Sequence, residues 1–137
     1  MMKQGNTYSL SFERAAFTEL RDMIERIFPD CLVAAEKSDA LFRAQLVSGT
    51  IGFVHIGMRD GGWRIVGIGV KEGFRGKGYG TCILDFAIDL IREMGGHRIT
   101  VLVDRNNATA IRMYAKAGFR LAGKQKSRLG MALVLNN

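Results

Sequence analysis

The stretch that decides the fold is residues 65–80, IVGIGVKEGFRGKGYG. Its apolar, glycine-containing start is typical of a buried strand, and the turn RGKGYG at 75–80 leads into a segment with helical spacing of apolar residues. Several glycines at a helix start let the backbone turn sharply and bring bare N–H groups close to a ligand. The first amides of a helix have no internal acceptor and lie at the positive end of its dipole. The sequence therefore predicts a strand–turn–helix unit that binds a phosphate, with Arg75 and Lys77 adding full charges.

The spacing of these glycines excludes two common nucleotide-binding patterns. The dinucleotide pattern GxGxxG, counted from Gly76, requires glycine where Thr81 stands. The P-loop pattern GxxxxGK[ST] fails because Lys77 is followed by Gly78 and not by a hydroxyl residue. We therefore expect a different phosphorylated ligand, although a plain glycine-rich connection would have the same composition.

Working outward from this unit, the pattern of apolar residues and turn residues predicts an α/β fold. The tight turns are expected at Ser48-Gly49 and at 59–62, and the segment 31–37 is ambiguous between a strand and an irregular connection. The strand at 99–103 is β-branched and apolar, which favours a parallel neighbour for the strand before the helix. The predicted elements are strands at 8–12, 41–47, 50–58, 63–70, 99–103 and 131–135, a further strand at Phe119, and helices at 14–28, 80–94 and 107–117. Together they predict a mixed sheet of about six to seven strands with flanking helices.

The size and composition of the chain indicate one domain over residues 1–137, with 47% hydrophobic and 24% charged residues. No stretch approaches the roughly 18 consecutive apolar residues of a membrane helix, and no apolar core follows the N-terminal lysine as in a secretory signal. Cys31 and Cys82 form no CxxC pair, and His55 and His97 lie far apart in the sequence. We expect a cytoplasmic protein with reduced thiols, no metal site and no membrane partner.

The formal net charge of +7 is concentrated in the last quarter of the chain. Residues 1–104 hold equal numbers of basic and acidic residues, and Asp104 is the last acid. The excess is carried by Arg105, Arg112, Lys116, Arg120, Lys124, Lys126 and Arg128. This distribution favours an anionic partner, which is a phosphorylated cofactor, an acidic protein surface or nucleic acid; a solvated basic face is the alternative.

A second motif lies at 107–119, NATAIRMYAKAGF, where one helix and one strand separate it from the glycine-rich turn. It closely resembles the pattern N-x-x-A-x-x-x-Y-x-x-x-G-F of the GNAT N-acetyltransferase superfamily. The turn resembles that superfamily's cofactor loop, R/Q-x-x-G-x-G/A, whose defined positions are filled by Arg75, Gly78 and Gly80. The resemblance is good over about residues 50–120 and poor over the first 45, and it implies the acyl-CoA N-acyltransferase fold.

By this resemblance the cofactor is acetyl-CoA, with its diphosphate on the backbone amides of 76–81 and its pantetheine arm paired like an added strand with residues 68–70. Asn107 and Tyr114 are seven residues apart, so they share a helix face and lie about 10 Å apart along the axis. The alternatives are a helix N-cap for Asn107 and a core tyrosine for Tyr114. The implied cofactor-binding residues are Ile68, Gly69, Val70, Arg75, Gly76, Lys77, Gly78, Tyr79, Gly80, Thr81, Asn107 and Tyr114.

The implied chemistry is direct attack of a neutral amine on the thioester. The Val70 N–H would stabilise the oxyanion, and the Tyr114 hydroxyl would protonate the departing thiolate. The general base is open, because many relatives have a glutamate on the strand at 63–70 and this strand has none. The candidates are His55, with an ordinary pKa near 6.5, Glu36, or water that passes protons to solvent. A lone strand histidine such as His55 is more often structural.

The sequence therefore predicts an enzyme that acetylates a primary amine on a small molecule, peptide or protein. The basic last quarter motivates a second reading, an acceptor amine linked to nucleic acid, such as a charged tRNA, and this reading is not favoured. The missing strand glutamate motivates a third, a non-catalytic acyl-CoA sensor domain. One N-terminal helix where relatives commonly have two predicts an open acceptor side, suited to a protruding chain end or to completion by a second copy in a homodimer.

Overall fold

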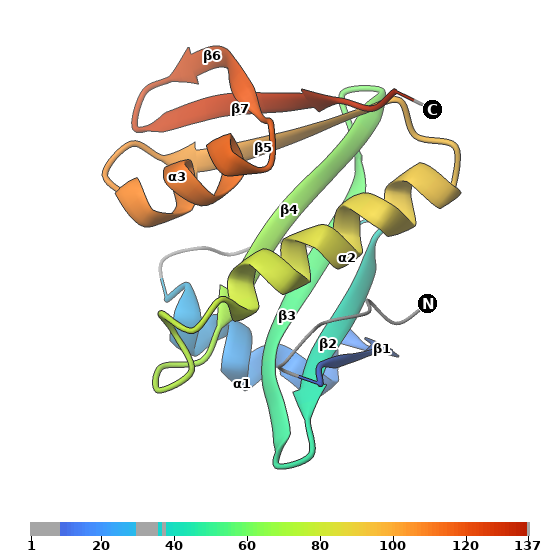
Figure 1. Ribbon diagram of the computed structural model, residues 1–137, viewed down its shortest axis with the longest axis vertical. Helices are drawn as coiled ribbons and strands as arrows, with labels where there is room; N and C mark the ends of the chain where they lie inside the picture. Colours follow the sequence, from blue (N-terminus) through green and yellow to red (C-terminus); the bar gives the residue numbers. More distant parts are fainter. Residues whose placement is uncertain (1–8, 30–35, 37, 137) are drawn as a thin grey trace.

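A seven-stranded mixed sheet forms the centre of the protein in a computed structural model that describes residues 9–29, 36 and 38–136 (Figure 1). The strand order is β1-β2-β3-β4-β5-β7-β6, and the sheet with its helices confirms the predicted fold class. The strands are β1 (Ser11–Ala15), β2 (Ala40–Leu46), β3 (Gly49–Arg59), β4 (Gly62–Val70), β5 (Arg98–Asp104), β6 (Arg120–Gln125) and β7 (Arg128–Val134), and the helices are α1 (Phe17–Ile27), α2 (Tyr79–Glu93) and α3 (Ala108–Lys116).

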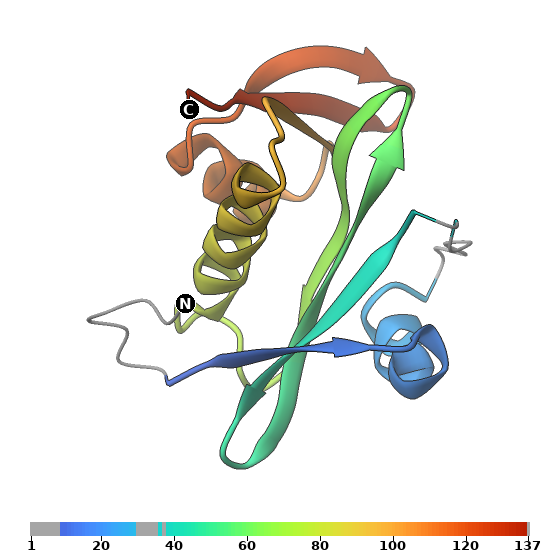
Figure 2. The same cartoon turned by 90° about the vertical axis from the view of Figure 1, so that its right-hand side faces the viewer.

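The helices cover the two faces of the sheet unequally, with α2 and α3 on one face and α1 on the other (Figure 2). The apolar stripe predicted for α2 is buried: Ile83, Leu84, Ala87, Ile88 and Ile91 all pack into the core on the α2 face. A smaller cluster on the α1 face has Leu20, Leu41 and Phe53 at its centre. Helices α1 and α2 thus bury the apolar face that their sequence period presents.

The strands β2 to β4 form an antiparallel meander, and β1 pairs with β2 at its edge. As expected, β4 pairs with β5 in parallel. That parallel pairing is short, because only the residues from Trp63 to Ile65 pair with β5. Immediately beyond Ile65 the register of β4 against β3 shifts, which leaves Val66 as an extra residue opposite the step from His55 to Ile56. A bulge of this kind bends a strand, and from this point β4 and β5 no longer pair.

The structure corrects several predicted boundaries. The turn between β2 and β3 falls at Val47-Ser48, one residue before the predicted Ser48-Gly49. The first strand is Ser11–Ala15 instead of 8–12, and Tyr8 lies outside the described residues, as do 31–35 and 37 from the ambiguous segment. A whole strand, β6, replaces the strand expected at Phe119; all its residues are exposed, so it has no alternating apolar face for a pattern to detect.

Candidate active site

A cleft of about 370 Å³ lies where β4 and β5 part. One side of it comes from α1 and β3, and the other from the end of β5 and from α3. Its apolar wall includes Phe17, Ile24, Ile27, Phe28 and Phe53, and its polar side chains are those of His55, Asp104, Asn107, Tyr114 and Arg128. Of the predicted site residues, the cleft therefore gathers Ile68, Asn107, Tyr114 and His55.

The end of β4 presents main-chain polar groups at the edge that β5 leaves open. The Lys71 N–H donates to the Ile51 carbonyl at 2.8 Å. Because hydrogen bonds alternate along an antiparallel ladder, the N–H and carbonyl groups of Ile68 and Val70 point away from β3, toward this open edge. The main chain of Gly69 faces β3 by the same alternation. Of the three predicted strand residues, two thus offer backbone groups to a ligand.

Gly69 is a point of close packing between β4 and α1. A Cβ at Gly69 would lie 2.6 Å from Cε1 of Phe53 and 3.0 Å from Cδ1 of Ile27. The absent side chain therefore lets α1 pack closely on the sheet, which sequence reasoning did not foresee.

The turn before α2 has the features of an anion-binding helix start: uncapped backbone amides and no acidic side chain in the first turn. Gly78 is the N-cap in the left-handed conformation, at φ 89°, with no side-chain cap, and the first helical turn holds no acidic residue. Gly76 also has a positive φ, 75°. The amides of the first turn, which include Gly80 and Thr81, have no intrahelical acceptors. The helix begins at Tyr79, one residue earlier than predicted, so the turn and the helix start coincide.

The charged side chains of the turn differ in their roles. Arg75 donates from Nε to the Val70 carbonyl at 2.8 Å, so it ties the turn to the end of β4. Lys77 is exposed. Gly80 lies against α3, since a Cβ there would be 3.3 Å from the sulfur of Met113. The predicted cofactor loop, the open edge of β4 and α3 are thus neighbours.

Asn107 is the N-cap of α3, as the alternative interpretation held: its Oδ1 accepts a hydrogen bond from the Ala110 N–H at 3.1 Å. The same residue lines the cleft together with Tyr114, which places both on the face of α3 that was predicted.

The Tyr114 ring is buried, 7% exposed, and packs edge-on against Phe119 with ring centroids 5.3 Å apart. Burial raises the pKa of Tyr114 to about 12, so the phenol keeps its proton throughout the neutral range. Among the described residues its hydroxyl has no hydrogen-bond partner. A buried, neutral phenol at a cleft can donate a hydrogen bond to a ligand.

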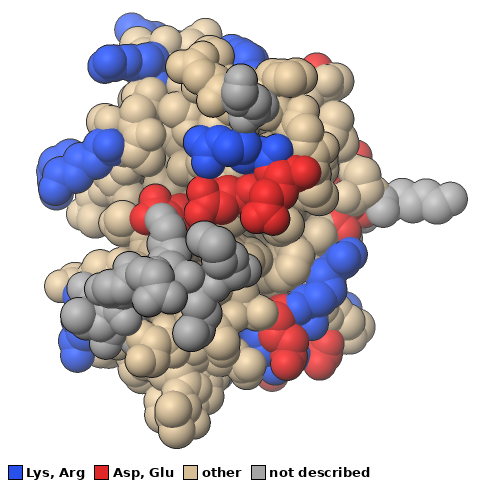
Figure 3. Space-filling view, turned by 45° about the vertical axis from the view of Figure 1, so that its right-hand side comes forward, with Lys and Arg blue, Asp and Glu red and all other residues tan. Residues whose placement is uncertain are grey.

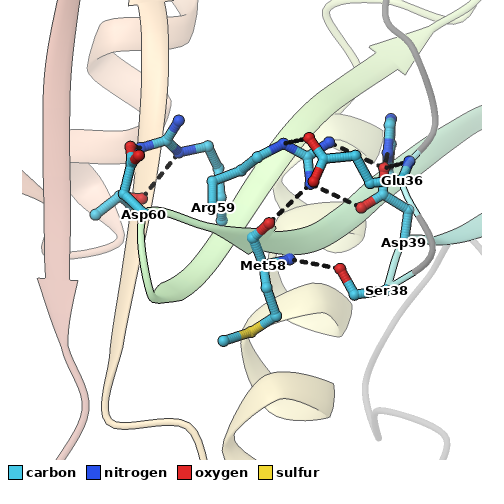
Figure 4. Close-up of polar contacts among 9 residues, drawn as sticks. Glu36, Ser38, Asp39, Met58, Arg59 and Asp60 are labelled. Carbon is cyan, nitrogen blue, oxygen red and sulfur yellow. Dashed lines mark hydrogen bonds and ion pairs between the residues drawn. The ribbon is translucent and has the colours of Figure 1, made fainter.

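His55 is 3% exposed and its Nε2 lies 2.6 Å from Oδ2 of Asp39. Burial lowers the pKa of His55, and the neighbouring Asp39 carboxylate only partly opposes that effect, so the ring is neutral at pH 7. Asp39 is in turn held by Arg59 (Figure 4). Sequence reasoning missed Asp39 and Arg59; alternation along β3 could have placed Arg59 on the face of His55, but Asp39 requires the fold.

Glu36, the other candidate base, is exposed and forms an ion pair with Arg59 at 3.2 Å. It is not among the described residues that line the cleft. Its only link to the cleft is through Arg59 and Asp39, which makes it a poor position for direct proton transfer.

The residues that carry the positive excess are all exposed, and they lie on the elements and turns that follow β5. Among them, Arg128 lines the cleft, opposite Asp104 in the register of β7 and β5. Elsewhere the charges are mixed: one face shows Lys and Arg side chains directly beside a row of Asp and Glu side chains (Figure 3). Among the described residues no group of three or more His, Cys, Asp and Glu could hold a metal ion.

A family model described as the acetyltransferase (GNAT) family matches residues 4–119. The chain belongs to this family, as the two sequence motifs predicted. No helix of the described residues is long and apolar enough to cross a membrane.

Solved structures show the same fold, and a curated relative matches part of the chain. A mycothiol acetyltransferase from Propionibacterium freudenreichii subsp. shermanii is 40% identical over 52 residues, which are 38% of this chain but 17% of that protein. A Bacillus subtilis acetyltransferase solved in complex with CoA superposes with a TM-score of 0.79 at 20% identity, covering 93% of this chain and 100% of the other. A GNAT family acetyltransferase from Elizabethkingia anophelis with acetyl-CoA bound superposes at 0.70 and 14% identity, covering 92% and 98%.

Proposed function

We propose that this protein is an N-acetyltransferase that transfers acetyl from acetyl-CoA to a primary amine by direct attack. The observation that carries the proposal is the cleft between β4 and β5, which has the open strand edge at Ile68 and the neutral phenol of Tyr114 among its walls. The family membership and the CoA-bound relatives of the same fold support the choice of cofactor.

The residues around the cleft fit a CoA-type ligand. When bound, acetyl-CoA supplies an activated acetyl thioester. The N–H and carbonyl groups of Ile68 bind its amide-containing arm as an added strand would, because they face an edge where no strand pairs. The amides at the start of α2 bind its diphosphate, favoured by the helix dipole and by Lys77. Arg75 holds the turn against the strand end.

Two groups of this chain act on the reacting atoms. The Val70 N–H points to the open edge and donates to the carbonyl oxygen, on which negative charge develops as the amine attacks. The Tyr114 hydroxyl donates to the departing sulfur, and its raised pKa guarantees that the proton is present at neutral pH. A neutral phenol beside the cleft favours catalysis over a sensor role, because binding alone requires no proton donor. We place the reaction in the cytoplasm, where thiols such as that of Cys82 stay reduced.

An unbiased product screen tests this function. The purified chain is incubated with acetyl-CoA and a library of amines, peptides and aminoacylated RNA, and products are identified by mass spectrometry. We expect an acetylated primary amine with stoichiometric release of thiol. Tight coenzyme A binding without turnover of any amine, equal in the wild type and in Tyr114→Phe, would support the acyl-CoA sensor in place of the enzyme.

An anionic acceptor is the second candidate, and Arg128 at the cleft favours it. Arg105 and Lys126 are exposed close by, since the Arg105 N–H bonds to the Ser127 carbonyl. For a nucleic-acid-linked acceptor, KM rises steeply with salt because phosphate contacts release counterions. Arg128→Gln would then raise the acceptor KM, while Arg120→Gln on the exposed strand β6 would not. Salt-independent turnover of neutral amines would exclude this candidate.

A further inference from the structure

Three hydrogen-bonded side chains, those of His55, Asp39 and Arg59, connect the wall of the cleft with the far end of β3. Arg59 bonds to both carboxylate oxygens of Asp39, from Nη1 to Oδ1 at 2.8 Å and from Nη2 to Oδ2 at 2.9 Å, and Oδ2 also contacts Nε2 of His55 at 2.6 Å. The Asp39 side chain is 0% exposed, and those of His55 and Arg59 are 4% and 16% exposed. Figure 4 shows Arg59 reaching from the end of β3 toward Asp39 and Glu36.

The sheet has a space shaped for the Asp39 carboxylate. Successive residues of a strand alternate between faces, so His55, Gly57 and Arg59 project on one face of β3. A Cβ at Gly57 would overlap Oδ1 of Asp39 and would lie 2.9 Å from Nη1 of Arg59. The absent side chain of Gly57 thus lets the carboxylate lie over the strand, between the imidazole and the guanidinium.

This arrangement selects one tautomer of the imidazole. An ionised carboxylate only accepts hydrogen bonds, so Nε2 of His55 carries the ring proton. In the neutral ring Nδ1 then has a free lone pair, and Nδ1 bonds to no other described residue. His55 lines the cleft and its ring is packed edge-on by Phe17 at 4.8 Å, so the imidazole has a fixed orientation in the cleft wall.

The charges around the imidazole are few. Asp39 and Arg59 act on its pKa in opposite directions, the carboxylate raising it and the guanidinium lowering it. The side chain of α1 that touches the ring is Phe17, which is apolar, and β4 presents Gly67 opposite His55. The other ionisable groups of the cleft are Tyr114, Asp104 and Arg128, and Glu36 contacts Arg59 from outside.

A contribution to stability does not by itself explain why the charged side chains of Asp39 and Arg59 are buried beside His55. Desolvation of a buried ion pair offsets most of its Coulombic attraction, and well-packed apolar residues often stabilise a fold as well or better. We propose that Asp39, held by Arg59, is a positioning residue that presents Nδ1 of His55 as the general base of the acetyl transfer. This inference rests on the proposed function, and it assigns the role that the strand glutamate has in many relatives.

The acetyl transfer combines two proton transfers from the acceptor nitrogen with the exchange of a carbon–sulfur bond for a carbon–nitrogen bond. The acceptor reaches the cleft as an ammonium ion, and Nδ1 of His55 takes one proton, which later passes to solvent. The freed nitrogen lone pair forms the bond to the acetyl carbon as the carbon–sulfur bond breaks and its electron pair goes to sulfur. The sulfur takes the proton of the Tyr114 hydroxyl, and a second proton lost by the nitrogen restores the phenol.

The test compares pH profiles of kcat/KM for the wild type and four variants. His55→Gln is expected to lower kcat/KM roughly 10²-fold at pH 7 and to remove the acidic limb of the profile. Asp39→Asn removes the charge that raises the His55 pKa, so the limb moves to lower pH. Arg59→Gln removes the charge that lowers it, so the limb moves to higher pH. Glu19→Gln, which breaks the exposed Arg43–Glu19 ion pair of 2.8 Å, is the matched control and leaves the profile unchanged.

Nitrogen NMR of the His55 ring supplies a readout that needs no turnover. We expect protonated Nε2 and bare Nδ1 in the wild type, and a mixture of tautomers in Asp39→Asn. If Asp39→Asn does not fold, Arg59→Lys, which keeps the charge and the limb position, is compared with Arg59→Gln.

The outcomes separate this inference from the proposed function. Three results would overturn the role of Asp39 and His55 while acetyl transfer stands. They are full activity of His55→Gln, an acidic limb at the wild-type pH in both Asp39→Asn and Arg59→Gln, and a proton on Nδ1 of His55 in the wild type. Absence of turnover by the wild type on every amine would instead overturn the proposed function.

Discussion

Tyr114 shows how burial sets the way in which a side chain can act. A phenol with a pKa of about 12 is a weaker acid than a thiol of ordinary pKa near 8.5, so complete proton transfer to a free thiolate would be uphill. The hydroxyl therefore acts first as a hydrogen-bond donor to the developing charge on sulfur. The proton moves fully only as the nitrogen proton replaces it.

Tyr114→Phe is expected to lower kcat roughly 10²-fold and to leave the affinity for coenzyme A nearly unchanged. The phenyl ring keeps its contact with Phe119, so the melting temperature should stay within a few degrees of the wild type. Steady-state kinetics, calorimetry of coenzyme A binding and thermal melts measure the three quantities. A variant with the kcat of the wild type would remove Tyr114 from the mechanism.

Asp39 makes the stability of the fold depend on pH. Burial alone would raise the pKa of Asp39, but hydrogen bonds from Arg59, the Glu36 amide and His55 outweigh it and hold the pKa below its ordinary value of 3.8. A carboxylate with a lowered pKa stabilises the fold fully above its unfolded-state pKa, and this contribution is lost as the pH falls below that value.

Asp39→Asn is accordingly expected to lower the free energy of unfolding by about 3 kcal/mol at pH 7, because Arg59 loses its buried partner. The difference from the wild type should shrink as the pH falls below 3.8. Urea unfolding at pH 7 and at several acidic pH values measures both effects. A difference that stays constant down to the lowest pH would contradict the assignment of a charged Asp39.

At the scale of elements, the start of α2 is the feature most specific to the proposed cofactor. The turn contains glycines at positive φ, no side-chain cap and no acid in the first helical turn. The amides of Gly80 and Thr81, in the first helical turn, lack intrahelical acceptors and can donate to a ligand or to water.

Gly76 offers a matched test of this element. Gly76 and Gly61 have φ of 75° and 80°, and in both cases a Cβ would meet nothing within 4 Å. Alanine at either position brings about the same backbone strain, on the order of 1 kcal/mol. Gly76→Ala should weaken coenzyme A binding roughly tenfold by displacing the turn amides, whereas Gly61→Ala in the β3–β4 turn should not. Equal affinities of the two variants in calorimetry would count against the turn as the diphosphate site.

The contact of α1 with the sheet depends on Gly69. Gly69→Ala is expected to destabilise the protein by ~2 kcal/mol, because the new methyl group would press on Phe53 and Ile27. Gly62→Ala, in the same strand with nothing within 4 Å, is the control and should change stability little. Chemical denaturation measures both, and equal stabilities would show that α1 can shift to admit the extra carbon.

The elements could be predicted where an apolar segment is bounded by turn residues. The apolar stripe of α2 and the turns that bound β3 and β4 identified those elements to within one residue at each end. The strand β6, with every residue exposed, carries no such signal, and its existence follows from pairing with β7. Cβ contacts such as those at Gly57 and Gly69 arise between distant segments, so no local pattern reports them.

For the whole molecule, the family and the fold class could be predicted because the two motifs have a fixed spacing around one helix and one strand. The partners of His55 could not, because Asp39 lies 16 residues away and meets it only when β2 pairs with β3. The roles of the individual site residues stay predictions. The charge excess of the last quarter is distributed over exposed positions on several elements, and only Arg128 of these lines the cleft.

The short pairing of β4 with β5 gives the backbone of the ligand-free protein a recognisable exchange pattern. The amide protons of Ile68 and Val70 face the open edge of β4 and should exchange quickly with deuterated solvent. The amide proton of Gly69, between them, is protected by its pairing with β3. Bound coenzyme A would accept hydrogen bonds from the amides of Ile68 and Val70. Exchange of these two amide protons would then slow, while that of Gly69 would stay unchanged. Residue-resolved hydrogen exchange measured by NMR would detect this alternation along residues 68–70. Equal protection of all three amides before any ligand is added would show that this edge of β4 is already hydrogen-bonded.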